Sequence, residues 1–212
     1  MAPVRTAFLE AADYAVALLR DPSVASNWDQ PSALTQMSVG ALAGHLARQV
    51  LSVQRVLVMP AVSEPPISLL EHYAKVTWME AGPQDAANVV VRQASDDEAA
   101  VGPTTLVANA ARVADELREQ LPAEPAGRVV LLPWGPWSLT LDDMLITRIM
   151  EIAVHSDDLA VSIGLPAVQL PEAAADIAAE LLVKIAMRRH GQAAILRALS
   201  RAERAPRSIA AF

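Results

Sequence analysis

The stretch that decides the fold is RIMEIAVHSDDLAVSIGLP, residues 148–166. Its apolar residues recur at helical spacing, and four ionisable residues follow one another at steps of three, four and three: Arg148, Glu151, His155 and Asp158. In an α-helix such steps keep returning to the same side, so the four side chains form one polar stripe. A polar stripe on a helix that otherwise reads as buried indicates a site for chemistry.

Helical patterns extend over most of the rest of the chain. Ser38 stands where an N-cap belongs, before an apolar stripe that runs to Pro60. Thr140 followed by Asp143 resembles a capping box, so the helix that carries the polar stripe is expected to begin near Leu141. Further helices are expected at 4–20, 68–80, 82–100 and 104–121, with two more after residue 171 and one extended piece at 129–132.

These elements predict an all-α protein, most simply a four-helix bundle with a loop-rich crossover and extra C-terminal helices. Residues 1–166 would form the bundle, and residues 167–212 would form a helical extension packed on the same domain. A length of 212 residues is enough for one domain with a substantial core.

Composition narrows the functional classes. The chain has no cysteine, which excludes disulfides, thiolate metal sites and a cysteine nucleophile, so any thiol chemistry needs an imported thiol. The N-terminus lacks the pattern of a secretory signal, and no uncharged apolar stretch approaches the roughly 18 residues of a membrane span. A soluble cytoplasmic protein without a membrane partner is therefore expected.

Charge is distributed unevenly along the chain. The net charge is −7, but the part from Lys184 onward carries seven basic residues and one acid, Glu203, which leaves −13 for the first 183 residues. An acidic body argues against nucleic-acid binding, because contacts with phosphates need positive charge. The basic C-terminal part can be a solvated helix face, or an arm that helps to hold an anionic ligand.

Glu151 and His155 form an E-x-x-x-H pair, whose side chains can converge on one ion from adjacent turns of a helix. His45 lies beside the apolar stripe of the helix after Ser38, and Gly44 next to it allows another backbone to come close. Two histidines and one carboxylate leave coordination positions open, as in catalytic rather than structural metal sites.

Other interpretations of these residues stay open at this stage. His45 can be a core histidine, Glu151 with His155 an ion pair on a helix surface, and Asp158 a residue near a helix end, with Asp157 as its competitor. Arg148 can pair with Glu151 or Asp158, or reach a substrate carboxylate. His72 and His190 lack comparable partners in the sequence and are predicted to be surface residues.

Two segments, SVGALAGHLA (38–47) and RIMEIAVHSDDLAVSIGLP (148–166), resemble the DinB-like superfamily, together with Trp28 and the lead-in WGPWSLTLDDML (134–145). The nearest branch is the mycothiol-dependent maleylpyruvate isomerase N-terminal domain family of actinobacteria, here as a single-domain member. Its signature is an H-L pair on the second helix and R-x-x-E-x-x-x-H-x-x-D-L on a later one, and both are complete. The resemblance covers roughly residues 4–166.

The resemblance implies a DinB-like four-helix bundle in which His45, Glu151 and His155 bind a divalent metal. Zinc is the first choice, and nickel, manganese or iron also suit such ligands. Asp158 matches an acidic residue beside the metal that is implicated in catalysis, and Arg148 is a second catalytic candidate. The thiol cosubstrate implied is mycothiol.

The predicted function is a metal-dependent thiol S-transferase or isomerase, in which the metal activates mycothiol for attack on an electrophilic small molecule and Asp158 manages protons. One alternative is a metal-dependent hydrolase that uses activated water. Another is a metal-binding or interaction protein without turnover. A homodimer is possible, although nothing in the sequence specifies its interface.

Overall fold

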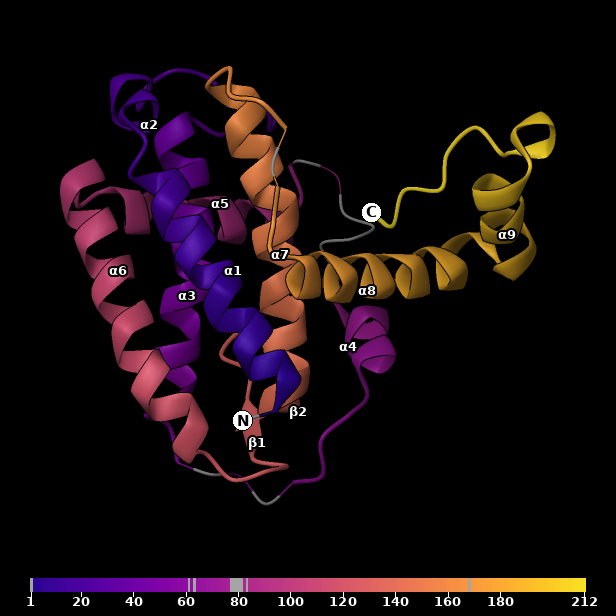
Figure 1. Ribbon diagram of the computed structural model, residues 1–212, viewed down its shortest axis with the longest axis horizontal. Helices are drawn as coiled ribbons and strands as arrows, with labels where there is room; N and C mark the ends of the chain where they lie inside the picture. The colour runs from indigo at the N-terminus through magenta and orange to yellow at the C-terminus, as the bar shows by residue number, and fades with distance from the viewer. Residues whose placement is uncertain (1, 61, 63, 77–81, 83, 168) are drawn as a thin grey trace.

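The computed structural model describes residues 2–60, 62, 64–76, 82, 84–167 and 169–212. Four long helices form its centre: α1 (Pro3–Leu19), α3 (Val39–Leu57), α6 (Pro103–Gln120) and α7 (Leu141–Ser162). As Figure 1 shows, α1 and α3 each pack against both α6 and α7, which closes a four-helix bundle. The expectation of an all-α fold is confirmed.

Shorter elements surround the bundle. These are α2 (Pro22–Ser26), α4 (Leu69–Lys75), α5 (Ala86–Ala99), α8 (Glu172–His190), α9 (Gln192–Ser200), two 3-10 turns (Leu121–Ala123 and Ala202–Arg204) and the strands β1 (Val129–Leu131) and β2 (Ser138–Thr140). The strands pair antiparallel, with Val130 opposite Leu139, so the extended piece expected near 129–132 is half of a hairpin. Residues 77–80 of the helix expected at 68–80 lie outside the described residues.

Helix α3, which carries His45, and helix α7, which carries the polar stripe, both begin after a capping residue. Ser38 Oγ accepts a hydrogen bond from the backbone N–H of Ala41 at 3.0 Å, and Thr140 Oγ1 accepts from that of Asp143 at 3.0 Å. The Asp143 carboxylate accepts from the Thr140 hydroxyl instead of its backbone N–H, so the cap at Thr140 is not a full capping box. The side chain of Asp143 is one methylene shorter than that of the glutamate usual at this position of a capping box.

Helix α5 lies against α3 at backbone distance. A Cβ atom placed on Gly44 would lie 2.4 Å from the carbonyl oxygen of Ser95 and 3.0 Å from the nitrogen of Ala99. Only glycine permits this approach, as the sequence suggested. The contact places the inner face of α5 beside His45.

A buried arginine ties the first helix to the end of α6. Arg5 is 4% exposed, and its Nε donates to Asp142 Oδ1 at 2.8 Å. Its Nη atoms donate to the carbonyls of Leu121, Glu124 and Pro125. A charged side chain so close to the N-terminus gave no sign in the sequence that it would be an interior anchor.

The prediction that His72 is a surface residue is wrong. His72 is 3% exposed, and its Nδ1 accepts a hydrogen bond from Trp137 Nε1 at 2.9 Å. The cause is a bond from the Ile67 N–H to the Ser138 carbonyl, which ties the start of α4 to the hairpin. Burial lowers the pKa of His72 to about 4. His190 is half-buried and contacts the Ala210 carbonyl through Nε2 at 2.7 Å.

The C-terminal part extends away from the bundle and returns. Helix α8 contacts α7 and α1 and runs crosswise to α7, away from the bundle, and α9 stands at its far end (Figure 1). The chain then returns toward the bundle. The Arg189 guanidinium donates a hydrogen bond to the Ala211 carbonyl, and Phe212 lines a cavity beside α7. No helix within the described ranges is both long enough and apolar enough to cross a membrane.

Replacing Gly44 with alanine is expected to lower the free energy of unfolding by about 2 kcal/mol, because the added methyl group must push α5 away from α3. Chemical denaturation followed by circular dichroism measures the change. Gly82→Ala is the control, since among the described residues its Cβ would meet Asp85 Oδ2 at an ordinary 3.7 Å. An equal or smaller loss for Gly44→Ala than for Gly82→Ala would contradict the close approach.

The buried, neutral His72 makes stability depend on pH. Its pKa is about 4 in the folded protein and near the ordinary 6.5 in the unfolded chain, so below pH 6.5 protons bind preferentially to the unfolded state. Between pH 7 and pH 5 the wild type is therefore expected to lose about 2 kcal/mol more stability than His72→Asn. Denaturant titrations at both pH values test this, and parallel losses in the two proteins would refute it.

Candidate metal centre

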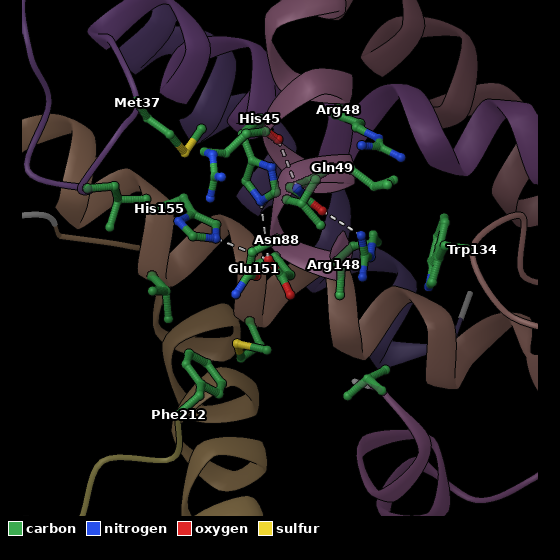
Figure 2. A pocket seen from close by; sticks show the side chains of 18 of the residues that line it. Met37, His45, Arg48, Gln49, Asn88, Trp134, Arg148, Glu151, His155 and Phe212 are labelled. Atoms are coloured by element: carbon green, nitrogen blue, oxygen red, sulfur yellow. Dashed lines mark hydrogen bonds and ion pairs between the residues drawn. The ribbon is translucent and has the colours of Figure 1, made fainter. Parts of the chain in front are cut away.

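Helices α3 and α7 meet in an antiparallel register that brings their polar residues together. His45 Nε2 lies 3.6 Å from Glu151 Oε2. One turn further along α3, and back along α7, Gln49 Oε1 accepts a hydrogen bond from Arg148 Nη1 at 2.5 Å. Figure 2 shows both pairs beside one cavity. The polar stripe of α7 therefore faces α3.

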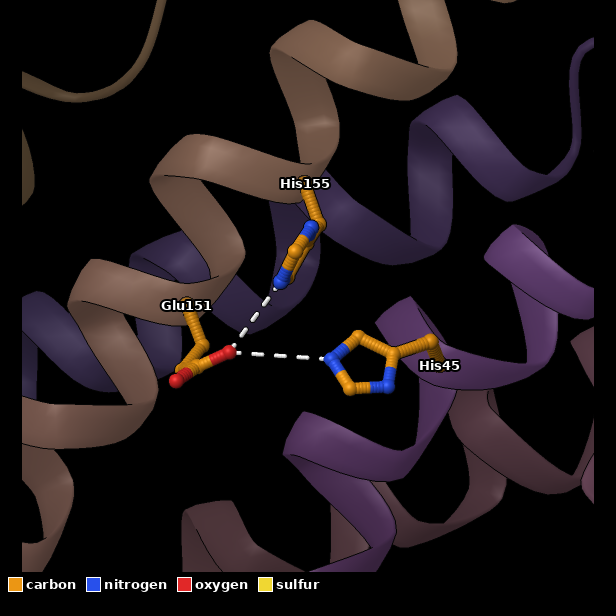
Figure 3. A group of neighbouring side chains, drawn as sticks. All are labelled: His45, Glu151 and His155. Atoms are coloured by element: carbon orange, nitrogen blue, oxygen red, sulfur yellow. Dashed lines mark hydrogen bonds and ion pairs between the residues drawn. The ribbon is translucent and has the colours of Figure 1, made fainter. Parts of the chain in front are cut away.

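Three potential ligand atoms converge at the first of these contacts (Figure 3). His155 Nε2 lies 3.1 Å from Glu151 Oε2, and the two imidazole rings meet edge to face with centroids 4.5 Å apart. One ligand atom from each of the three residues lies within 4.8 Å of the other two. Ligands bound to zinc at about 2.1 Å in tetrahedral geometry are about 3.4 Å apart, so this donor set fits the ion.

Hydrogen bonds outside the cluster orient both imidazoles. Ser95 Oγ donates to the Val91 carbonyl at 2.7 Å and so accepts from His45 Nδ1, 3.1 Å away. Asp158 Oδ2 lies 3.0 Å from His155 Nδ1 and accepts its proton. These partners assign the Nδ1–H form to each ring, which leaves both Nε2 atoms for the centre. Metal-binding histidines in proteins are held in the same way.

The electrostatics of the cluster favour a positive charge at its middle. Burial opposes ionisation of the Glu151 carboxyl, but hydrogen bonds with His155 and His45 outweigh burial and hold its pKa well below the ordinary value. Burial lowers the pKa of His155, yet its bonds to Asp158 and Glu151 raise it to about 9. Burial and the nearby His155 lower the pKa of His45. A proton or a divalent ion can satisfy the carboxylate at this point.

A cavity of about 810 Å³ opens next to the cluster and is lined by His45, Glu151 and His155 themselves. Its walls come from α3, α5 and α7, from the turn between the two strands and from Phe212 (Figure 2). Glu151 is only 13% exposed at its side chain. A metal held by the three residues would therefore face a space large enough for two small ligands.

Arg148 forms an ion pair with neither Glu151 nor Asp158, the two partners considered from the sequence. It is 9% exposed, and its Nε donates to Thr147 Oγ1 while Nη1 donates to Gln49. Its guanidinium carbon lies 4.9 Å from the ring centroid of Trp134. Arg148 lines the cavity one helical turn from Glu151, so contact with a ligand remains open to it.

The structure brings together the three predicted ligands and places the other candidates around them. Asp158 lies behind His155 on Nδ1 and is not among the described residues that line the cavity, and Asp157 is exposed. Their catalytic roles stay predictions. Sequence analysis missed Ser95 and Gln49, and Gly44 was the signal for the first, because it indicated where another helix comes close.

The basic arm proposed from the sequence contributes no cation to the cavity. Among the described lining residues, none of the basic ones lies after residue 183, and the arm supplies Phe212 instead. The cationic side chains in the wall are Arg48, Lys75, Arg92 and Arg148.

Comparison with known proteins agrees with this architecture. A family model described as the mycothiol maleylpyruvate isomerase N-terminal domain matches residues 8–160, which is most of the chain. The match confirms the resemblance seen in the sequence, a DinB-like domain, and it includes the three ligand candidates. No curated protein and no solved structure matches the chain.

Removing the hydroxyl of Ser95 is expected to weaken zinc binding roughly tenfold, because His45 loses the partner that holds its Nε2 toward the centre. Competition with a fluorescent zinc chelator measures the affinity of Ser95→Ala. Ser156→Ala is the matched control, since Ser156 adjoins His155 and is buried, but its Oγ has no hydrogen-bond partner in the described structure. Equal affinities in all three proteins would show that Ser95 does not orient the ligand.

Proposed function

The chain belongs to the mycothiol maleylpyruvate isomerase N-terminal domain family, and on this basis we propose that it is a metal-dependent enzyme that uses mycothiol. In the proposed reaction the thiol sulfur attacks an electrophilic small molecule. The outcome is either thiol S-transfer or an isomerisation in which the thiol is released again. Zinc is the metal proposed first.

One observation carries this proposal: His45 Nε2, His155 Nε2 and Glu151 Oε2 converge in the wall of a cavity. A three-residue donor set of this kind would leave coordination positions open on a bound metal, and all three residues line the cavity. A structural metal would need a fourth protein ligand. Among the described residues, the group able to hold an ion has these three members.

A divalent metal bound there supplies positive charge that favours the thiolate over the thiol near neutral pH. Residues of the protein would hold the metal and orient its ligands. Glu151 and the two histidines hold the centre in place, while Ser95 and Asp158 fix the rings through their Nδ1–H groups. Asp158 supports the site as a positioning residue, because its carboxylate bonds the far side of the His155 ring.

The apolar walls of the cavity favour thiol chemistry over hydrolysis as the first candidate. Val91, Val154 and Phe212 line the space around the ligands, and such apolar side chains offer a competing water molecule no hydrogen-bond partner. Hydrolysis by activated water remains the second candidate, because the same open coordination position suits a water molecule.

Wild-type protein purified without a histidine tag is expected to contain about one divalent ion per chain by mass spectrometry. The double variant His45→Ala/Glu151→Ala should lose that ion. After the uncatalysed rate is subtracted, its rate of conjugating mycothiol to monobromobimane should be at least tenfold lower than that of the wild type. Glu180→Ala, which removes an exposed acid paired with Lys184 away from the centre, should keep both properties. A wild type without metal after incubation with zinc, and without conjugation, would refute the proposal.

The same preparation separates thiol transfer from hydrolysis. Ester cleavage by the wild type without thiol, lost in the double variant, would favour the hydrolase. Metal binding with neither reaction would favour a protein that binds metal without turnover.

A further inference from the structure

The cavity beside the centre is cationic in a protein that is acidic as a whole. Four basic residues line it, Arg48, Lys75, Arg92 and Arg148, and among the described lining residues Glu151 has the one acidic side chain. The whole chain carries a net charge of −7. The basic residues of this cavity therefore surround the space in which a ligand would lie.

Arg48 has no partner within the described part of the chain. Like Arg92, it is half-buried in the wall of the cavity and makes no hydrogen bond or ion pair there, and it lies three residues after His45 on α3. Burial and the charges of Arg55 and Arg148 lower its pKa, and together they outweigh the opposite effect of the Glu98 and Glu151 carboxylates. A guanidinium in such a place presents its N–H donors to the cavity without an acceptor. A negatively charged ligand group would remove this deficit.

Arg148 offers a second guanidinium that is already held in place. Bonds to Gln49 and Thr147 and the stacking on Trp134 fix its plane. They leave Nη2 without a hydrogen-bond acceptor in the described structure, on a side chain that lines the cavity. Holding the group in advance lowers the entropy lost when it binds an anion.

The two arginines form a layer next to the metal ligands. Arg48 follows His45 by three residues on α3, and Arg148 precedes Glu151 by three on α7. Because α3 and α7 run antiparallel here, both steps lead the same way, about 5 Å along the bundle. An anionic group bound between Arg48 and Arg148 would hold the rest of its molecule beside the centre.

The remaining wall is apolar and too large for a small anion alone. It includes Met37, Val76, Val91, Met150, Val154 and Phe212. A volume of about 810 Å³ is within the range of cavities that enclose drug-sized ligands. A carboxylate with only two or three carbons would leave most of this apolar surface uncovered.

We propose that the electrophilic acceptor of this enzyme is an amphiphilic anion, with a carboxylate or similar group bound by Arg48 and Arg148 and an apolar aromatic or alkyl body against Val91, Val154 and Phe212. This substrate class rests on the proposed function, because it names the acceptor of the same site. The arginine layer selects the charge, and the apolar wall selects the body.

Calorimetric titration of the zinc-loaded protein with 2-naphthoate, 2-naphthylmethanol and succinate tests both parts. Naphthoate is expected to bind at least tenfold more tightly than the uncharged alcohol, which has the same rings, and than succinate, which has charge without an apolar body. Equal affinities for naphthoate and the alcohol would overturn the proposal.

Two variants locate the binding groups. Arg48→Gln should weaken naphthoate about tenfold and leave naphthylmethanol unchanged, which also shows that the variant is folded. Phe212→Ala should weaken both aromatic ligands alike. Arg118→Gln is the control, since Arg118 pairs with Asp13 at the surface and does not line the cavity. Its affinity for naphthoate should equal that of the wild type.

The affinity for naphthoate could be the same in Arg48→Gln as in the wild type and be lost when zinc is removed. That result would place the carboxylate on the metal and overturn the arginine layer. That failure is distinguishable from failure of the proposed function. Metal content and mycothiol conjugation are measured with monobromobimane, which carries no carboxylate, so they can succeed whatever the naphthoate result.

Discussion

The burial of the Glu151 carboxylate between α3 and α7 is the constraint on which the rest of the structure depends. Removing a carboxylate from water costs several kcal/mol unless opposite charge or hydrogen bonds compensate. His155 compensates from the same helix and His45 from the opposite one, 3.1 and 3.6 Å away. A slip of α3 by one residue would turn His45 about 100° away from the carboxylate. The register of the central helix pair and the geometry of the centre are therefore one requirement.

The close approach of α5 to α3 follows from the same requirement. His45 can present Nε2 to Glu151 only if its Nδ1–H has an acceptor, and Ser95 on α5 is that acceptor. Ser95 reaches His45 because Gly44 has no side chain. Glycine inside a helix is less stable than alanine by up to about 1 kcal/mol, so α3 gives up some intrinsic stability to bring α5 near. The loss is local, while the gain is an oriented ligand.

Sequence reasoning reached the helices and the ligand triad because each rests on local patterns. Caps at Ser38 and Thr140 and the spacing of apolar residues define the bundle helices, and E-x-x-x-H defines half of the centre. His45 was already a candidate because it lies beside the apolar stripe of its own helix, and the family resemblance paired it with Glu151 and His155, since spacing alone cannot pair two distant helices. Ser95 lies 50 residues from His45, and nothing local marks a serine as its partner. The error at His72 has the same origin, because its burial depends on a hairpin far along the chain.

The charges of the cavity also explain why the overall charge says little about the ligand. At physiological salt the field of the acidic surface fades within about 8 Å, whereas charges that are partly buried in the wall of a cavity are screened less. Arg48 and Arg148 repel each other there, and a bound divalent ion would add to the repulsion. The proposed thiolate and anionic acceptor would each bring one negative charge to this space. Each would therefore offset part of the repulsion between the cations that line the cavity.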